Sequence, residues 1–287
     1  MGLQYRDLRY LRVPVEDLGA AANFASDIIG LQAADRDSEN ARFRSDARNY
    51  ALCYTAKAGP AALALTVARL EDLDQMLEQL QKWQPRRLTE EECAERQIKS
   101  GITVLAPNGI AVELVWRPMT SGWRYHAPRD AGITEFQAVQ LACKNVSANE
   151  DFWIKGVGAS VSDWVGDVAF LRIDEAHHRI ALYPSKRDGV LGATWAVEGI
   201  NQVMQGWYYF QSRQVPVVHG PGRQPASNAI FVTASGPGGI YYSYAAETES
   251  GAHIAARGPR QFTDNPASHC GWGALTTVPE FMGGEDQ

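Results

Sequence analysis

The sequence is poor in cysteine and carries no excess of basic residues. Its four cysteines, Cys53, Cys93, Cys143 and Cys270, lie far apart and form no C-x-x-C pair. This pattern favours reduced thiols over disulfides or a zinc site. The sequence has 27 Lys and Arg residues and 33 Asp and Glu residues, which gives a net charge of -6. An acidic chain without a basic face argues against a nucleic-acid partner.

Long apolar runs are also missing. No stretch approaches the roughly 18 apolar residues of a membrane-spanning helix, and the opening MGLQYRDLRY lacks the apolar core of a signal peptide. We therefore expect a cytoplasmic protein with no membrane partner. The 287 residues, 45% of them hydrophobic, suffice for two medium domains or one large one.

An internal duplication is the strongest feature that is present. YLRVPVEDLGAAANFASDIIGLQ resembles AVQLACKNVSANEDFWIKGVGAS, each with an apolar strand, a turn, a helix and a glycine. Further along, Val67 corresponds to Val197 and Pro107 to Pro237, both at an offset of 130 residues. Correspondences at a nearly constant offset predict two copies of one module.

Each copy contains two strand–helix halves, separated by short β-rich runs such as GITVLA and NAIFVTA. We therefore predict an α+β fold of two tandem modules, each built from paired βαβββ units that form a cupped eight-stranded sheet. The predicted boundaries are 3–117 for the first module, 118–132 for a linker, 133–247 for the second module and 248–287 for a tail. The tail shows little periodicity and is expected to wrap the second module or form a subunit contact.

Several stretches resemble one known family. VPVEDLGAAANFASDIIGLQ, DEAHHRIALYP, GPGRQPASNAIFV, GPGGIYY and a late GWG are similar to the type I extradiol ring-cleavage dioxygenases. These are two-module members of the vicinal oxygen chelate (glyoxalase) superfamily, and the 2,3-dihydroxybiphenyl dioxygenases are the nearest type. The resemblance runs from about residue 8 to residue 244 and implies the same two-module fold.

The resemblance also implies where a metal would lie. In that family two histidines and a glutamate of the second module hold Fe(II) or Mn(II). The matching positions here are Ala138, Gly192 and Ser243, and the family's acid–base histidine in a nearby turn is matched by Gln224. We therefore expect no metal and no other cofactor.

Glu113 of the first module corresponds to Ser243 of the second. Its companions at the positions of the family's histidines would be Tyr10 and Ala62, neither of which is an imidazole. We expect Glu113 to form a buried ion pair with Arg12 rather than to bind a metal.

One catalytic residue of the family is kept. In EAHHRIAL the second histidine, His178, matches the histidine that hydrogen-bonds the substrate and manages protons beside the metal. An imidazole suits general acid–base work without any ion, so His178 is the predicted catalytic residue, and His177 is expected to matter much less. The remaining histidines are expected on loop surfaces: His126, His219, His253 and His269.

The three replaced ligand positions hold small residues. If the site had decayed into core, large apolar side chains would be expected to fill it. Small residues instead predict a cavity, which we expect to bind an aromatic small molecule. The predicted substrate-binding residues are polar or aromatic: Gln140, Thr194, Gln224, Asn228, Tyr241 and Ser243.

Three classes of function remain open. The first is a metal-independent enzyme acting on a phenolic, catecholic or quinonoid compound. The second is a metal-dependent extradiol dioxygenase, with Fe(II) or Mn(II) held by ligands in another register. The third is a non-catalytic aromatic-binding protein or partner subunit. Because the family builds oligomers and the tail offers Phe262, Trp272 and Phe281 as anchors, we also expect a homo-oligomer.

Overall fold

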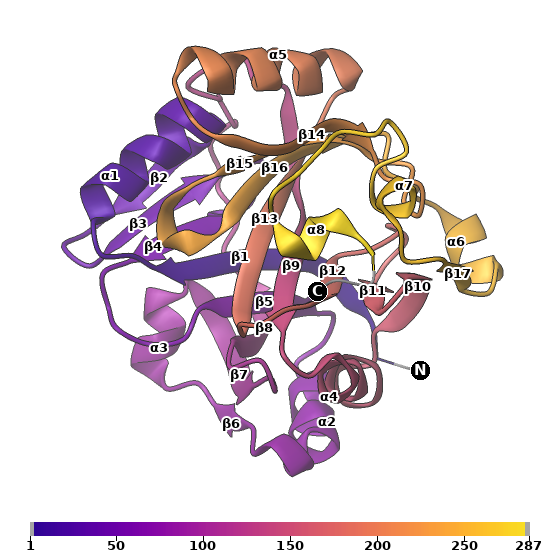
Figure 1. Cartoon of the computed structure of the whole chain (residues 1–287). Coiled ribbons are helices and arrows are strands. Elements are labelled where there is room, and N and C mark those ends of the chain that lie inside the picture. The colour runs from indigo at the N-terminus through magenta and orange to yellow at the C-terminus, as the bar shows by residue number, and fades with distance from the viewer. Residues whose placement is uncertain (1–2, 285–287) are drawn as a thin grey trace.

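The computed structural model describes residues 3–284, which form two large β-sheets around a shared hydrophobic core (Figure 1). The first half comprises β1 (Tyr5–Pro14), α1 (Leu18–Asn23), η1 (Phe24–Ile29), β2 (Gln32–Arg36), β3 (Asn40–Arg44), β4 (Leu52–Thr55), β5 (Ala62–Val67), α2 (Glu71–Gln79), η2 (Gln81–Trp83), β6 (Arg86–Arg87), α3 (Glu90–Glu95), β7 (Ile98–Leu105) and β8 (Ala111–Pro118). The second half comprises β9 (Ile133–Cys143), α4 (Val146–Asp151), η3 (Phe152–Val157), β10 (Ser160–Val165), β11 (Val168–Arg172), β12 (Ile180–Pro184), β13 (Gly189–Val197), α5 (Ile200–Ser212), β14 (Val217–Arg223), β15 (Ile230–Ser235), η4 (Pro237–Gly239) and β16 (Tyr241–Ala246).

The two sheets repeat one topology. The first has the order β2-β3-β4-β1-β5-β8-β7-β6, and the second has β14-β15-β16-β13-β9-β12-β11-β10-β17, where β17 (Arg260–Phe262) comes from the tail. In each sheet two βαβββ units meet through an antiparallel central pair, β1 with β5 and β9 with β13. The predicted α+β fold of paired units is confirmed, whereas the positions of the module boundaries remain a prediction.

The duplication also holds at the level of single strand partners. Glu113 of β8 pairs with Ala64 of β5, and Ser243 of β16 pairs with Thr194 of β13. Both members of the second pair lie 130 residues beyond those of the first, as the sequence comparison predicts. The same strand geometry therefore presents a glutamate in one sheet and a serine in the other.

The first helix of each half begins at equivalent caps. The side chains of Asp17 and Asn145 accept hydrogen bonds from the backbone amides of Ala20 and Ala148, at 2.8 and 2.9 Å, which satisfies an otherwise unpaired helix N–H. The longest helix is α5, with 13 residues, and it packs against β14, β15 and β16. Within residues 3–284 no helix is both long and apolar enough to cross a bilayer.

The tail alters the predicted strand number. It forms α6 (Ala252–Ala256), β17 (Arg260–Phe262), α7 (Pro266–His269) and α8 (Pro279–Met282). Strand β17 pairs in parallel with β10 and makes the second sheet nine-stranded rather than eight-stranded. Figure 1 shows the tail in yellow crossing the second sheet. Its lack of sequence periodicity reflects short elements held by contacts with the sheet.

The predicted Arg12–Glu113 ion pair is wrong. Strand β5 lies between β1 and β8, and Arg12 instead pairs with Glu95 of α3 at 3.1 Å. Glu113 accepts hydrogen bonds from Tyr10 at 2.6 Å and from Arg96 at 2.7 Å. Tyr10 reaches it across Ala64, the β5 residue that pairs with both, because the alanine leaves room above the intervening strand.

Candidate functional site

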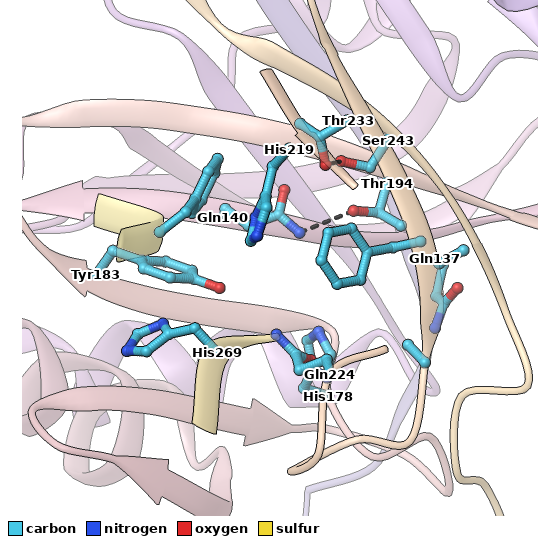
Figure 2. A pocket seen from close by; sticks show the side chains of 14 residues that line it. Gln137, Gln140, His178, Tyr183, Thr194, His219, Gln224, Thr233, Ser243 and His269 are labelled. Carbon is cyan, nitrogen blue, oxygen red and sulfur yellow. Dashed lines mark hydrogen bonds between the residues drawn. The ribbon is translucent and has the colours of Figure 1, made fainter. Parts of the chain in front are cut away.

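A pocket lies on the second sheet where its central strands meet the C-terminal tail (Figure 2). Its cavity measures about 70 Å³. The lining residues come from β9 and β12 to β16, from two loops and from the tail: Gln137, Gln140, His178, Tyr183, Thr194, His219, Gln224, Ala229, Phe231, Thr233, Ser243, Ala245, His269 and Phe281.

Hydroxyl and carboxamide groups from neighbouring strands form one wall of this pocket. Side chains on a strand alternate between faces, which brings Gln140 of β9, Thr194 of β13 and Ser243 of β16 to the same side of the sheet. Gln140 Nε2 donates to Thr194 Oγ1 at 2.8 Å. Thr233 and Ser243 share a hydrogen bond between hydroxyls at 2.9 Å. Figure 2 shows both bonds, which fix the rotamers of these side chains.

Of the three positions that match the family's metal ligands, only one lines the pocket. Ser243 lines the pocket, but Ala138 and Gly192 are not among its lining residues in the described part of the chain. Gly192 pairs with Gln140 on β9, and a Cβ built on Gly192 would lie 2.9 Å from Gln140 Oε1. The room expected above the glycine is therefore taken by the Gln140 side chain.

His178 lines the pocket from the loop between β11 and β12. Its Nδ1 lies 3.0 Å from Nδ1 of His177, and Nε2 of His177 lies 2.7 Å from Oδ2 of Asp163 in β10. His177 and Asp163 are completely buried. A chain of hydrogen bonds thus runs from Asp163 through His177 to His178 at the pocket. His177 is the central member of this chain.

Two arginines of the tail hold the buried end of this chain. Arg257 donates to both oxygens of Asp163, at 2.9 and 3.0 Å. Arg260 donates to the same carboxylate from its backbone N–H at 2.8 Å and from Nε and Nη2 at 3.1 and 2.7 Å. Burial alone would raise the pKa of Asp163, but hydrogen bonds from His177, Arg260 and Arg257 outweigh it and hold the pKa well below its usual range.

The hydrogen bonds assign the tautomers of the two histidines. Because Asp163 is ionised, Nε2 of His177 donates to it and leaves Nδ1 as an acceptor, which receives the Nδ1–H of His178. This leaves Nε2 of His178 as a lone-pair nitrogen for a pocket occupant. Burial, chiefly, and the positive charge of the neighbouring Arg179 hold the pKa of His178 well below its ordinary value, so the resting imidazole is neutral.

Two further histidines belong to the pocket, contrary to the prediction that they lie on loop surfaces. His219 of β14 and His269 of α7 are 5% and 7% exposed and both line the cavity. Burial and the neighbouring His269 lower the pKa of His219 to about 4. His269 Nε2 lies 2.9 Å from Asp264 Oδ1. His126 and His253 are exposed, as predicted.

Of the remaining predicted substrate-binding residues, one lines the pocket and two lie outside its lining. Gln224 lines the pocket and accepts a hydrogen bond from the Ser227 hydroxyl. Asn228 does not line it within residues 3–284, and its side-chain oxygen accepts from Arg223 at 2.6 Å. Tyr241 also lies outside the lining set and packs against Phe281, with ring centroids 5.6 Å apart. Sequence reasoning had no signal for Phe281 in the pocket beyond its suggested role as an anchor.

The donor set does not fit the metal site of the related family. A facial Fe(II) triad needs two imidazoles and a carboxylate on converging strands, whereas β9, β13 and β16 present the carboxamides of Gln137 and Gln140 and the hydroxyls of Thr194 and Ser243. Among residues 3–284 no three His, Cys, Asp or Glu side chains gather closely enough to hold a metal ion. The three pocket histidines come from separate elements. His178 is hydrogen-bonded to His177, and His269 is hydrogen-bonded to Asp264.

Comparison with known families finds a match to part of the second half. The profile of the Glyoxalase/Bleomycin resistance protein/Dioxygenase superfamily matches residues 135–244. A search of curated proteins found no match.

Solved structures share the fold of the whole chain. The Mn(II)-bound glyoxalase from Novosphingobium aromaticivorans has 22% identity and a TM-score of 0.85, covering 99% of this chain and 96% of that one. BphC, a halotolerant catechol dioxygenase, has 19% identity and a TM-score of 0.86, covering 97% of both chains. Homoprotocatechuate 2,3-dioxygenase from Brevibacterium fuscum, solved with 3,4-dihydroxyphenylacetate, has 18% identity and a TM-score of 0.85, covering 97% and 92%. The whole chain therefore has the extradiol-dioxygenase-like fold of these structures.

Proposed function

We propose that the chain is a metal-independent enzyme acting on an aromatic small molecule, phenolic, catecholic or quinonoid, bound in the second half. His178 is its general acid–base. The observation that carries the proposal is the chain of hydrogen bonds from Asp163 through His177 to His178, which ends at a pocket. Cytoplasmic location and a homo-oligomeric state remain expectations beside it.

The histidine pair explains how a buried imidazole could still accept a proton. A lone buried His178 would be a weak base, because its charged form lacks water. When Nε2 takes a proton from a ligand hydroxyl, the Nδ1 proton can move to His177, which lies beside the ionised Asp163. The positive charge then rests next to a carboxylate, and the ligand is left as an oxyanion. The reverse movement returns the proton.

Other groups of the pocket would orient the ligand. Gln140 and Thr194 are already bonded to each other, as are Thr233 and Ser243, so their remaining donors and acceptors have fixed directions. Prearranged dipoles of this kind stabilise developing charge without reorganising during reaction. The mismatch of the donor set with a metal triad supports a route in which these side chains, rather than an ion, meet the ligand oxygens.

The experiment is turnover of a panel of phenols, catechols and quinones by chelator-treated protein, followed by absorbance and oxygen uptake. With an active compound in hand, His178→Ala should lower kcat by a factor of about 10² to 10⁴, the usual worth of general acid–base catalysis. The matched control is His253→Ala, which removes an exposed imidazole and should leave kcat unchanged.

Two outcomes would count against the proposal. If activity appears only after Fe(II) or Mn(II) is added, the chain is a metal-dependent dioxygenase with ligands not recognised here. If no compound turns over but some bind, it is a binding protein or partner subunit that has kept the pocket.

A further inference from the structure

The pocket is uncharged. None of its 14 lining residues within the described chain is Asp, Glu, Lys or Arg. The pKa of His178 lies well below the ordinary value, and that of His219 is about 4, so both imidazoles are neutral at neutral pH. A positive charge on His269 would be balanced by Asp264 beside it. An anionic ligand would therefore find no free countercharge.

Three rings surround the side chain of Phe281 in α8. Its ring centroid lies 5.5 Å from Tyr183 and 5.8 Å from His219, nearly parallel to the latter, and 5.6 Å from Tyr241. These separations are those at which aromatic rings attract. The cage already holds one six-membered ring, supplied by the chain itself.

The cavity, which is partly open to solvent, leaves little room for a second ring inside it. Its volume of about 70 Å³ is about half of the roughly 150 Å³ of an engineered cavity that binds benzene. A ring bound fully inside the cavity therefore requires a lining side chain to move. Phe281 is the best candidate, because it lies on a helix of only four residues and its ring already occupies the aromatic cage.

We infer that the pocket takes an uncharged, single-ring aromatic molecule, and that the ring of Phe281 competes with the ligand's ring for the cage of Tyr183, His219 and Tyr241. The inference concerns the same site as the proposed function and rests on it for location, but it does not require turnover. Hydroxyl groups on the ring would meet Nε2 of His178 and the pocket carboxamides. A carboxylate would lose its hydration without gaining an ion pair, which is costly in a buried site.

The charge preference is tested by calorimetric binding of two ligands of the same shape. The anion is 3,4-dihydroxyphenylacetate, and its neutral counterpart is 3,4-dihydroxyphenylacetamide. We expect the amide to bind at least about tenfold more tightly at pH 7, since desolvating an unpaired carboxylate is the larger cost. Equal affinity, or tighter binding of the anion, would overturn the charge half of the inference.

The competition is tested with Phe281→Ala. Removing the ring should raise the affinity for catechol and for 3,4-dihydroxyphenylacetamide by about tenfold or more, because the cage no longer has to be emptied. Met282→Ala is the matched control, since Met282 is 47% exposed and lies outside the pocket lining. Unchanged affinity in Phe281→Ala, or no binding of the neutral ring to either protein, would refute the competition.

A third variant locates the binding. Ala229→Leu adds bulk to the pocket wall and should abolish binding, whereas Ala255→Leu on the exposed face of α6 should not. Binding that survives Ala229→Leu lies elsewhere and overturns the inference. Because every readout is affinity, a failed search for turnover would sink the proposed reaction and leave this ligand class standing, and the reverse also holds.

Discussion

At the scale of single residues, His219 connects the pocket to the pH dependence of stability. Folding lowers its pKa from an ordinary value of about 6.5 to about 4. Between these values the unfolded chain binds the extra proton and the folded chain does not, so stability falls as the pH falls. At pH 5 this group alone costs about 2 kcal/mol relative to pH 7.5.

Replacing His219 by phenylalanine should flatten this dependence. The ring that stacks between Phe231 and Phe281 is kept, while the titrating group is removed. Urea unfolding at pH 7.5 and pH 5 measures the difference in the free energy of unfolding, which should shrink by about 2 kcal/mol. The exposed His253, replaced by glutamine, should leave the difference as it is. An unaltered pH dependence in the phenylalanine variant would show that His219 is protonated in the folded protein.

At the scale of elements, strand β17 does more than extend a sheet. It places Arg260 on Asp163, the residue with which it pairs on β10. Removing that positive charge should make it easier for the neighbouring histidine pair to hold a proton. Arg260→Gln should therefore move the acidic limb of the kcat/KM profile to higher pH, and Asp163→Asn should move it to lower pH.

The variant Arg260→Lys separates the electrostatic role of Arg260 from its role in anchoring the tail. Arg260→Lys keeps the charge and should restore the acidic limb, although it loses the paired geometry of the guanidinium. The loss of charged hydrogen bonds in Arg260→Gln should also cost about 1.5–3 kcal/mol of stability. A lower Tm with an unmoved pH profile would mean that β17 only anchors the tail.

The same elements show what the sequence can and cannot predict. The resemblance of the local motif EAHHRIAL to a known family predicts His178 as a site residue, and the side chain lines the pocket. His219 and His269 were missed because the path of the tail, which no periodicity encodes, brings α7 and β14 to the same cavity. The predicted partner of Arg12 is wrong because a periodic pattern shows which face a side chain occupies but not the register: Ala64 of β5 pairs with both Tyr10 and Glu113, whereas Arg12 pairs with Ala62.

At the scale of the whole molecule, a turn from each half packs against the first strand of the other half, β9 or β1. Asn108, between β7 and β8, is buried and donates from Nδ2 to the carbonyls of Ala142 and Gly189, both at 3.2 Å. The equivalent turn holds Gly238, whose φ is +76° and where a Cβ would lie 2.6 Å from Cγ1 of Val13 on β1. The proline–glycine turns that reveal the duplication are thus the contacts that join its copies.

Because these turns bridge one continuous core, the two halves should unfold together. Asn108→Ala leaves the buried carbonyl of Ala142 and the partly buried carbonyl of Gly189 without this donor and should lower the free energy of unfolding by about 1–3 kcal/mol. Far-UV circular dichroism and tryptophan fluorescence should still give coincident transitions. Asn23→Ala, at an exposed position, should change little. Separated transitions in the Asn108 variant would contradict a single cooperative unit. They would show that each sheet is stable by itself and that the reciprocal turns only align two independent domains.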